Sequence, residues 1–327
     1  MRDFEYFEPA TINEAISLLV RYGKKAKVLA GGTDLLVAMK QGVVNPDCLV
    51  SIKRIPSLNH ISYDGKKGFK IGALATLREV ESSPLVQEKI DVLAQAAHKV
   101  GAARIRNLGT IVGNLCQDVR CLYYPWAHLW RRAPCYRARG NVCYAVKGAK
   151  SCQAMATSDI APALITLEAS VSAVGLQGER TIPIEKFFAE AGVTTLQEGE
   201  ILTGIEIANP PPHTWGVYLK HSVRGVLDFA LAGVAVVLTL DSNGGACNDA
   251  KIGLIGVART PIRASKAEGM LKGERIEDNL IDQAARAASG EVRPIGDIHG
   301  SATYRRRMVN YLVKRAMRQA LDIAKKV

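Results

Sequence analysis

The strongest constraint on the fold lies in residues 27–55, where two short apolar runs flank a pair of glycines and a helical segment. Residues 27–30 have the apolar character of a strand, and Gly31 and Gly32 follow as a tight turn. A helix begins at Thr33 or Asp34, and residues 49–55 form a second strand that ends before Pro56. Strand, turn, helix and strand in this order predict a small parallel α/β unit.

The rest of the chain also alternates between strand and helix patterns. Helical spacing marks residues 12–21, and a strand followed by a short helix is expected in 69–84, with another helix in 90–100. The glycines in 104–115 favour a turn-rich backbone over a helix, and the apolar run 161–167 precedes a strand. After a proline-rich linker at 209–213, strands in 228–245 and 246–264 and helices in 283–292 and 305–327 predict an α+β C-terminal part.

Composition limits the class of protein. The chain has 327 residues, of which 48% are hydrophobic and 23% charged, so it is globular and has room for two or three domains. No apolar run approaches the ~18 residues of a membrane span, and the N-terminus lacks a signal-peptide pattern, so we expect a cytoplasmic protein with no membrane partner. Its seven cysteines then favour metal or iron–sulfur binding over disulfides. The net charge of +12 predicts an anionic partner, but no nucleic-acid-binding module is recognisable, so no nucleic acid is expected.

Two glycine loops are candidates for binding phosphate. Gly31 and Gly32 allow backbone N–H groups to approach an anion closely, and the following helix adds its dipole. The loop 109–114, GTIVGN, can face the first loop and hold the other side of a pyrophosphate. Neither loop matches the dinucleotide or P-loop fingerprints, and one glycine turn before a helix is more often only a turn. The pair strengthens the phosphate hypothesis.

The order of several short motifs identifies a resemblance that covers nearly the whole chain. The motifs are AGGTDLL (30–36), IGALATL (71–77), ARIRNLGTIVGN (103–114), SDIAPAL (158–164), the Lys220–Arg224 pair in LKHSVRGVLDFA, and SATYRRRM (301–308). This series resembles the FAD-binding medium subunits of the molybdenum hydroxylase (xanthine dehydrogenase/CO dehydrogenase) family. The resemblance implies an α+β (α/β) fold, with a two-part FAD-binding domain of the PCMH/vanillyl-alcohol-oxidase type at 1–57 and 58–212. A smaller α+β domain would follow at 213–327.

The resemblance also implies which residues contact FAD. They are Leu29, Ala30, Gly31, Gly32, Thr33, Asp34, Leu35, Arg106, Thr110, Ile111, Gly113, Asn114, Asp159 and Lys220. Val112 stands where the family usually has glycine. Because a β-branched residue disfavours positive φ, we expect Val112 to be extended, which leaves its backbone contact to the phosphates open. Arg224 and Asp228 are interpreted as structural.

A cysteine-rich insert at about 116–155 separates the second glycine loop from Asp159. Its sequence, NLCQDVRCLYY (114–124), Cys135 and GNVCYAVKGAKSC (140–152), is similar to the insert in the β subunits of 4-hydroxybenzoyl-CoA reductases. That similarity implies a [4Fe–4S] cluster. The implied ligands are Cys121, Cys135, Cys143 and Cys152. Their spacing contains no CxxC, so it matches neither zinc ribbons nor bacterial ferredoxins, and a Cys₄ zinc site is the alternative. Cys116 is interpreted as a small buried residue beside the flavin loop, and Cys48 and Cys247 as core thiols.

The implied function is electron transfer through FAD and a [4Fe–4S] cluster within a heteromeric molybdenum enzyme that dehydroxylates an aryl-CoA reductively. Catalytic residues would lie on a molybdopterin-binding large subunit, with a [2Fe–2S] small subunit between, in a dimer of heterotrimers. Ferredoxin or a similar acidic carrier would dock near Arg131, Arg132, Arg137 and Arg139, unless these arginines only cover the insert. Two alternatives stay open: a hydroxylase subunit that passes electrons outward, and a non-enzymatic iron–sulfur or zinc regulator that binds nucleic acid.

Overall fold

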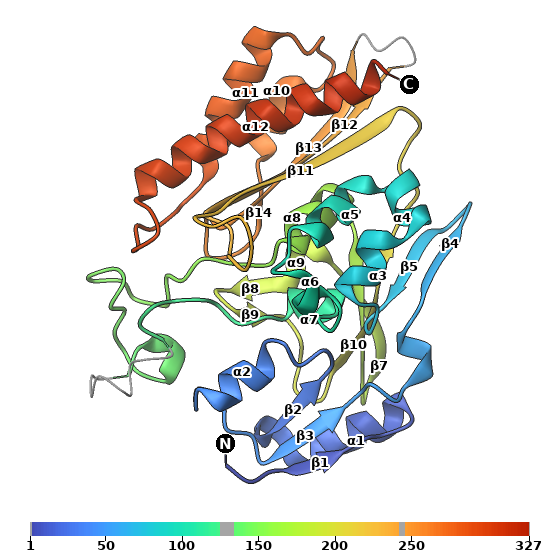
Figure 1. Cartoon of the computed structure of the whole chain (residues 1–327), viewed down its shortest axis with the longest axis vertical. Coiled ribbons are helices and arrows are strands. Elements are labelled where there is room, and N and C mark those ends of the chain that lie inside the picture. Colours follow the sequence, from blue (N-terminus) through green and yellow to red (C-terminus); the bar gives the residue numbers. More distant parts are fainter. Residues whose placement is uncertain (1, 125–133, 242–245, 327) are drawn as a thin grey trace.

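The computed structural model describes residues 2–124, 134–241 and 246–326 (Figure 1). These residues form three sheet-centred units that follow one another from the blue N-terminal end to the red C-terminal helices. A small parallel sheet comes first, a five-stranded antiparallel sheet lies in the middle, and a four-stranded antiparallel sheet comes last. The two largest apolar clusters are centred on the middle unit and on the last unit.

The N-terminal unit confirms the predicted parallel α/β unit. Its strands pair in parallel in the order β1-β3-β2. The Thr11 hydroxyl accepts a hydrogen bond from the Glu14 backbone N–H and caps the first helix, whose apolar face packs on the sheet. The elements are β1 (Glu5–Phe7), α1 (Ile12–Tyr22), the 3₁₀ turn η1 (Gly23–Lys25), β2 (Ala26–Leu29), α2 (Leu35–Lys40), β3 (Cys48–Ser51) and the 3₁₀ turn η2 (Pro56–Leu58).

The central unit is an antiparallel sheet in the order β4-β5-β10-β6-β7. Strand β10 comes last of the five in the sequence but lies between β5 and β6. It therefore joins the early hairpin β4–β5 to the later hairpin β6–β7 in one sheet. The strands are β4 (Ile61–Asp64), β5 (Gly68–Gly72), β6 (Ser170–Gly175), β7 (Gly178–Pro183) and β10 (Ile201–Ile207), with the separate hairpin β8 (Phe188–Glu190) and β9 (Val193–Thr194). The helices are α3 (Leu77–Ser82), α4 (Pro84–Lys89), α5 (Asp91–His98), α6 (Ala103–Arg106), α7 (Ile111–Leu115), α8 (Ile160–Thr166) and α9 (Ile184–Phe187), with the 3₁₀ turn η3 (Tyr136–Ala138) in the insert.

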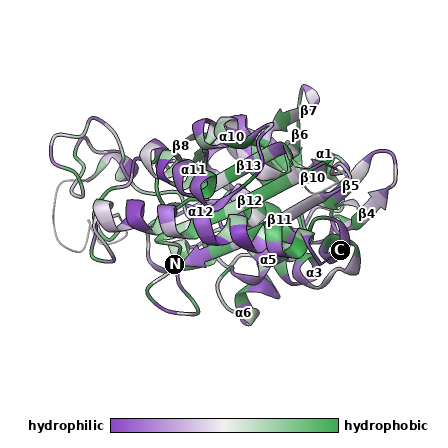
Figure 2. Ribbon diagram, turned by 90° about the horizontal axis from the view of Figure 1, so that it is seen from above, coloured by the Kyte–Doolittle hydropathy of each residue, from purple (hydrophilic) through white to green (hydrophobic). Residues whose placement is uncertain are grey.

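The C-terminal unit is a sheet that is buried on both faces. Alternate residues of β12 point to opposite sides, so Val234, Val236 and Leu238 join the C-terminal core while Ala235 and Val237 join the central core. Helices α10 to α12 pack on one face, and α5 and α8 of the central unit pack on the other (Figure 1). Figure 2 shows β12 and β13 as apolar ribbon beside α12, which carries hydrophilic residues. The elements are β11 (Thr214–His221), β12 (Ala232–Leu240), β13 (Cys247–Ile255), β14 (Ile262–Arg263), α10 (Ser265–Leu271), α11 (Asp278–Glu291) and α12 (Ala302–Ala324).

The stretch 104–115 differs from its prediction. It was expected to be turn-rich, but it contains most of α6 and all of α7, separated by a short loop. Val112 was expected to be extended, which is wrong. Thr110 is the extended residue, with φ −93° and ψ 156°, and Val112 is the second residue of α7. Helices of four or five residues show too little of the 3.6-residue period to be seen in a glycine-containing sequence.

No helix within 2–124, 134–241 and 246–326 is both long enough and apolar enough to span a bilayer.

Candidate FAD site and cysteine cavity

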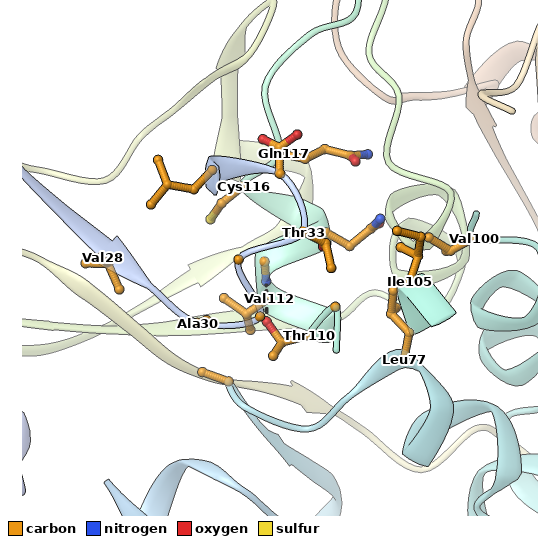
Figure 3. A pocket seen from close by; sticks show the side chains of 18 of the residues that line it. Val28, Ala30, Thr33, Leu77, Val100, Ile105, Thr110, Val112, Cys116 and Gln117 are labelled. Carbon is orange, nitrogen blue, oxygen red and sulfur yellow. Dashed lines mark hydrogen bonds between the residues drawn. The ribbon is translucent and has the colours of Figure 1, made fainter. Parts of the chain in front are cut away.

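A groove of about 510 Å³ lies between the N-terminal and central units (Figure 3). This volume is within the roughly 300–1,000 Å³ of typical ligand sites. Its walls come from segments far apart in the sequence: the loop after β2, the loop between α6 and α7, the start of α8, and residues 227–229. In the close-up, Thr33, Thr110 and Val112 lie near one another, and Leu77, Val100 and Ile105 form an apolar side (Figure 3).

The first wall is the loop between β2 and α2. Gly32 has φ +79°, a conformation that residues with a Cβ rarely adopt. Gly31 packs so closely on the second loop that a Cβ built there would lie 2.2 Å from the Leu108 carbonyl oxygen. Among the residues that the structure describes, none accepts a hydrogen bond from the backbone N–H groups of Gly31 to Leu35. The loop therefore offers a row of free donors at the start of α2, an arrangement that binds anions.

The second wall is the loop that leads into α7. The Thr110 hydroxyl accepts a hydrogen bond from the Gly113 N–H (3.1 Å) and so caps the helix. The Leu77 N–H donates to the Gly109 carbonyl (2.8 Å), which fastens the loop to the start of α3. Val112 lines the groove with its side chain almost fully buried. The wall is therefore rigid on the side that faces the first loop.

Most of the residues that the sequence assigns to FAD line this groove. They are Leu29, Ala30, Gly31, Gly32, Thr33, Asp34, Leu35, Thr110, Gly113, Asn114 and Asp159. Two others have different surroundings: Ile111 is fully buried in the central core, and the Arg106 guanidinium donates to the Glu81 carboxylate (2.8 Å) and the Val100 carbonyl (3.2 Å). Arg106 thus joins α6 to α3. The Lys220 ammonium lies behind the wall, 2.7 Å from the Asp159 carboxylate.

Asp34 connects the first loop to the beginning of the insert. Its carboxylate accepts a hydrogen bond from the Asp118 backbone N–H (3.1 Å) and pairs with the Arg120 guanidinium. That guanidinium carbon also lies 5.3 Å from the centroid of the Phe229 ring, a cation–π distance. The insert therefore touches the groove on two sides.

Two groove residues were not among the predicted contacts. Cys116 ends α7 and lines the groove with an exposed side chain, beside the flavin loop as expected but not buried (Figure 3). Gln117 also lines the groove, and its side-chain nitrogen is buried without a hydrogen-bond partner in the described structure. Nothing in the local sequence around Gln117 indicates this position, because it depends on how the insert leaves α7.

The four predicted cluster ligands share one small cavity of about 20 Å³. Cys121, Cys135, Cys143 and Cys152 all line it, with tyrosine and valine side chains between them. The Cys135 carbonyl accepts hydrogen bonds from the N–H groups of Ala138 and Gly140 (both 2.8 Å), so a tight turn holds this cysteine. No three His, Cys, Asp or Glu side chains in the described ranges come close enough to hold a single metal ion.

Burial raises the pKa of the Cys121 and Cys152 thiols. Backbone N–H groups act in the opposite direction, those of Tyr123 and Tyr124 on Cys121 and that of Ala154 on Cys152. Such donors stabilise thiolates, which are the form that binds metal. The cavity therefore favours neutral thiols unless a positively charged centre binds them.

Arg137, predicted to belong to a docking patch, is an internal clamp. Its Nε and Nη2 donate to one oxygen of Asp118 (3.0 and 2.7 Å), and Nη2 also donates to the Gly192 carbonyl (2.7 Å). Its side chain is only 23% exposed. Arg139 is exposed, whereas Arg131 and Arg132 lie outside the described residues. Arg139, Lys147 and Lys150 are the exposed basic residues in the described part of the insert from residue 134 to residue 152, and the docking patch stays a prediction.

The groove suits a cofactor that combines phosphates with a flat apolar ring, as FAD does. The unpartnered N–H row and the Gln117 amide supply donors, and the apolar side of the groove supplies a surface for stacking or packing a ring. A Cβ at Gly31 would obstruct the junction of the two loops. The residues present therefore fit the cofactor that the sequence resemblance implies.

Comparison with known proteins agrees with this assignment. Residues 2–210 match the family model for the FAD binding domain in molybdopterin dehydrogenase, and residues 217–320 match the CO dehydrogenase flavoprotein C-terminal domain. The carbon monoxide dehydrogenase medium chain of Hydrogenophaga pseudoflava is 32% identical over 97% of this chain and 96% of its own length. Subunit alpha of the 6-hydroxypseudooxynicotine dehydrogenase complex of Paenarthrobacter nicotinovorans is 29% identical, over 98% of this chain and 96% of its own length.

A solved structure shows the same architecture. It is that of carbon monoxide dehydrogenase from Hydrogenophaga pseudoflava lacking the Mo-pyranopterin moiety of its cofactor. It superposes with a TM-score of 0.82 at 32% identity, over 98% of this chain and 97% of that chain. The family models together cover nearly the whole chain, and its relatives are subunits of dehydrogenases. The chain therefore belongs to the FAD-binding medium subunits of the molybdenum hydroxylase family and is an oxidoreductase subunit.

Proposed function

We propose that this chain carries a [4Fe–4S] cluster in addition to FAD and serves a molybdenum enzyme that removes a phenolic hydroxyl from an aryl-CoA. The observation that carries the proposal is the convergence of Cys121, Cys135, Cys143 and Cys152 on one cavity, although they are scattered along the insert. Unrelated thiols that are scattered along an insert have no reason to meet in this way. The motif frame around these cysteines matches that of 4-hydroxybenzoyl-CoA reductase β subunits.

The spacing of the four thiols favours a cluster over zinc. A tetrahedral Cys₄ zinc site with Zn–S bonds of about 2.3 Å requires sulfurs within roughly 4 Å of one another. A cubane cluster binds each thiolate to a different iron and holds the sulfurs farther apart. The cysteines share a cavity yet form no group tight enough for a single ion. The absence of a tight group argues against a single zinc ion.

When bound, FAD and the cluster supply transfer of one and two electrons. The chain's own residues hold these groups: the free N–H row of the first loop, the Thr110 cap and Asn114 toward FAD, and the four insert thiols toward the cluster. The Asp34–Arg120 and Asp118–Arg137 pairs fasten the insert beside the groove. The protein thereby sets the relative position and the electrostatic surroundings of the two centres.

We infer that the partners are a molybdopterin-binding large subunit, which carries the substrate chemistry, and a [2Fe–2S] small subunit, assembled as a dimer of heterotrimers. The similarity to chains named as medium chains and complex subunits supports a place in a multi-subunit complex. Ferredoxin or another acidic carrier would supply the electrons. Reductive dehydroxylation consumes two electrons and two protons, replaces the hydroxyl with hydrogen and releases water.

A second candidate keeps the same cofactors but reverses the flow. The relatives include dehydrogenases for carbon monoxide, glyceraldehyde and 6-hydroxypseudooxynicotine, whose names indicate that electrons leave the substrate. In that case the insert would serve an electron acceptor.

Metal analysis and turnover of the native complex test these proposals. The cluster predicts about four iron and four acid-labile sulfide per copy of this chain beyond those of the [2Fe–2S] small subunit, together with FAD. Equimolar zinc in place of this additional iron and sulfide would contradict it. Reduction of 4-hydroxybenzoyl-CoA to benzoyl-CoA by the complex with a reduced low-potential donor is expected. If the complex instead only reduces dyes at the expense of an oxidisable substrate, the second candidate is correct.

A further inference from the structure

Three buried polar side chains form a connected cluster directly behind the groove wall. Asp159 lines the groove, and this residue is only 3% exposed. One of its oxygens accepts a hydrogen bond from the Tyr218 hydroxyl (2.7 Å), and the other accepts one from the Lys220 ammonium (2.7 Å). Tyr218 is 2% exposed and does not itself line the groove. The cluster reaches FAD only through Asp159.

The local sequence explains why these side chains meet. Tyr218 and Lys220 are two residues apart on β11, so both point to the same face of the strand, toward the start of α8. Asp159 occupies the N-cap position of α8, but its side chain caps nothing, which leaves the carboxylate available for the strand. The opposite strand makes room, because a Cβ on Gly233 would lie 2.6 Å from the Tyr218 hydroxyl oxygen.

Each partner of Asp159 is itself held in place. The Lys220 ammonium also donates to the Lys99 carbonyl at the end of α5 (2.9 Å), and the Tyr218 backbone N–H donates to the Gln95 side-chain oxygen (2.9 Å). Burial and the neighbouring Asp159 carboxylate raise the pKa of Tyr218, so its hydroxyl remains a donor at any physiological pH. The carboxylate is therefore fixed by two rigid donors from one strand.

We propose that Tyr218 is a positioning residue that sets how the Asp159 carboxylate meets bound FAD, and that Gly233 is the residue that leaves space for it. The proposal rests on FAD occupying the groove. Without the Tyr218 hydroxyl, one Asp159 oxygen has no donor and the carboxylate turns toward Lys220. The groove then presents a differently oriented acceptor, although no groove residue has been replaced.

A double-mutant cycle tests this proposal on the purified full chain, depleted of flavin and titrated with FAD. Tyr218→Phe is expected to raise the Kd of FAD roughly tenfold, the scale of one hydrogen bond to a charged group, and to shift the midpoint potential of the bound flavin. The same change in an Asp159→Asn background is expected to have no further effect on either quantity. Gly233→Ala is expected to reproduce the Tyr218→Phe result. The matched control is Tyr63→Phe, whose hydroxyl makes no hydrogen bond within the described structure and lies away from the groove.

The results of these titrations distinguish a failure of the Tyr218 proposal from a failure of the FAD assignment. If Tyr218→Phe lowers the melting temperature while FAD affinity and flavin potential stay at wild-type values, Tyr218 is only structural and the proposal is overturned. An effect of equal size in the Asp159→Asn background also overturns it, because Tyr218 would then not act through Asp159. If the wild-type chain itself binds no FAD, the groove assignment fails instead. Should Gly233→Ala not fold, the Tyr218 and Asp159 cycle decides alone.

Discussion

Replacing Gly31 with alanine is the sharpest test of how the groove is built. The added methyl carbon would stand 2.2 Å from the Leu108 carbonyl oxygen and 2.9 Å from the Gly109 Cα. Even a close carbon–oxygen contact measures about 3.3 Å, so the two loops would have to separate by roughly 1 Å. This substitution changes no charge and removes no hydrogen-bonding group.

Hydrogen bonds on both sides of Gly109 hold the second loop in place. The Leu77 N–H donates to the Gly109 carbonyl (2.8 Å), and the Gly109 N–H donates to the Ile105 carbonyl (2.7 Å). Forcing a methyl group into such a fixed contact costs about 1–3 kcal/mol. Because both loops face the cofactor, we expect this strain to appear mainly in binding. At tenfold per 1.4 kcal/mol, the Kd of FAD rises roughly 5- to 140-fold.

Fluorescence titration of the flavin-free Gly31→Ala chain with FAD measures the effect, and thermal unfolding with and without FAD shows whether the fold persists. Gly65→Ala is the control, since a Cβ there meets nothing within 4 Å. We expect wild-type affinity in the control. Wild-type affinity in Gly31→Ala as well would refute the reasoning, because the contact between the loops would then not shape the site.

Four further substitutions follow from the structure. Gly32→Val should abolish detectable FAD binding in the same titration, because valine strongly disfavours φ +79°; retained binding would mean that the loop does not hold the cofactor. Cys135→Ser should lower iron and acid-labile sulfide while FAD stays bound, and Cys116→Ser should leave iron unchanged, as measured by metal analysis; the reverse pattern would exchange their roles. Val112→Gly should lower the melting temperature by several degrees, because it removes a buried side chain from α7, with little loss of FAD affinity; an unchanged melting temperature would contradict this account.

The parts of the fold that the sequence predicts are those with a clear period. Residues 12–21 and 305–327 show helical spacing over several turns, and the structure has the helices Ile12–Tyr22 and Ala302–Ala324 there. The short helices α6 and α7 were missed because neither completes two turns. Strands β4, β7 and β10 were also missed, since their place in the sheet depends on pairing between distant segments.

The candidate site also has parts that the sequence predicts and parts that it does not. The first glycine loop was predictable because it is local, and the structure places all seven residues from Leu29 to Leu35 along the groove. The surroundings of Arg106 were not predictable, since Glu81 pairs with it from another helix. Tyr218 did leave a signal: it stands two residues before Lys220 on a strand, and so shares the face of a residue already assigned to the site.

The two loops of the groove have a consequence for the amount of protein in a cell. Gly31 and Leu108 lie far apart in the sequence and belong to different units, so their contact, and with it the groove, requires the folded chain. A ligand that binds only the folded state stabilises it by mass action, by about 2.7 kcal/mol at a hundred times its Kd. Flavin supply should therefore set how much of this subunit escapes proteolysis, and a riboflavin-starved culture should accumulate less of it at equal messenger levels.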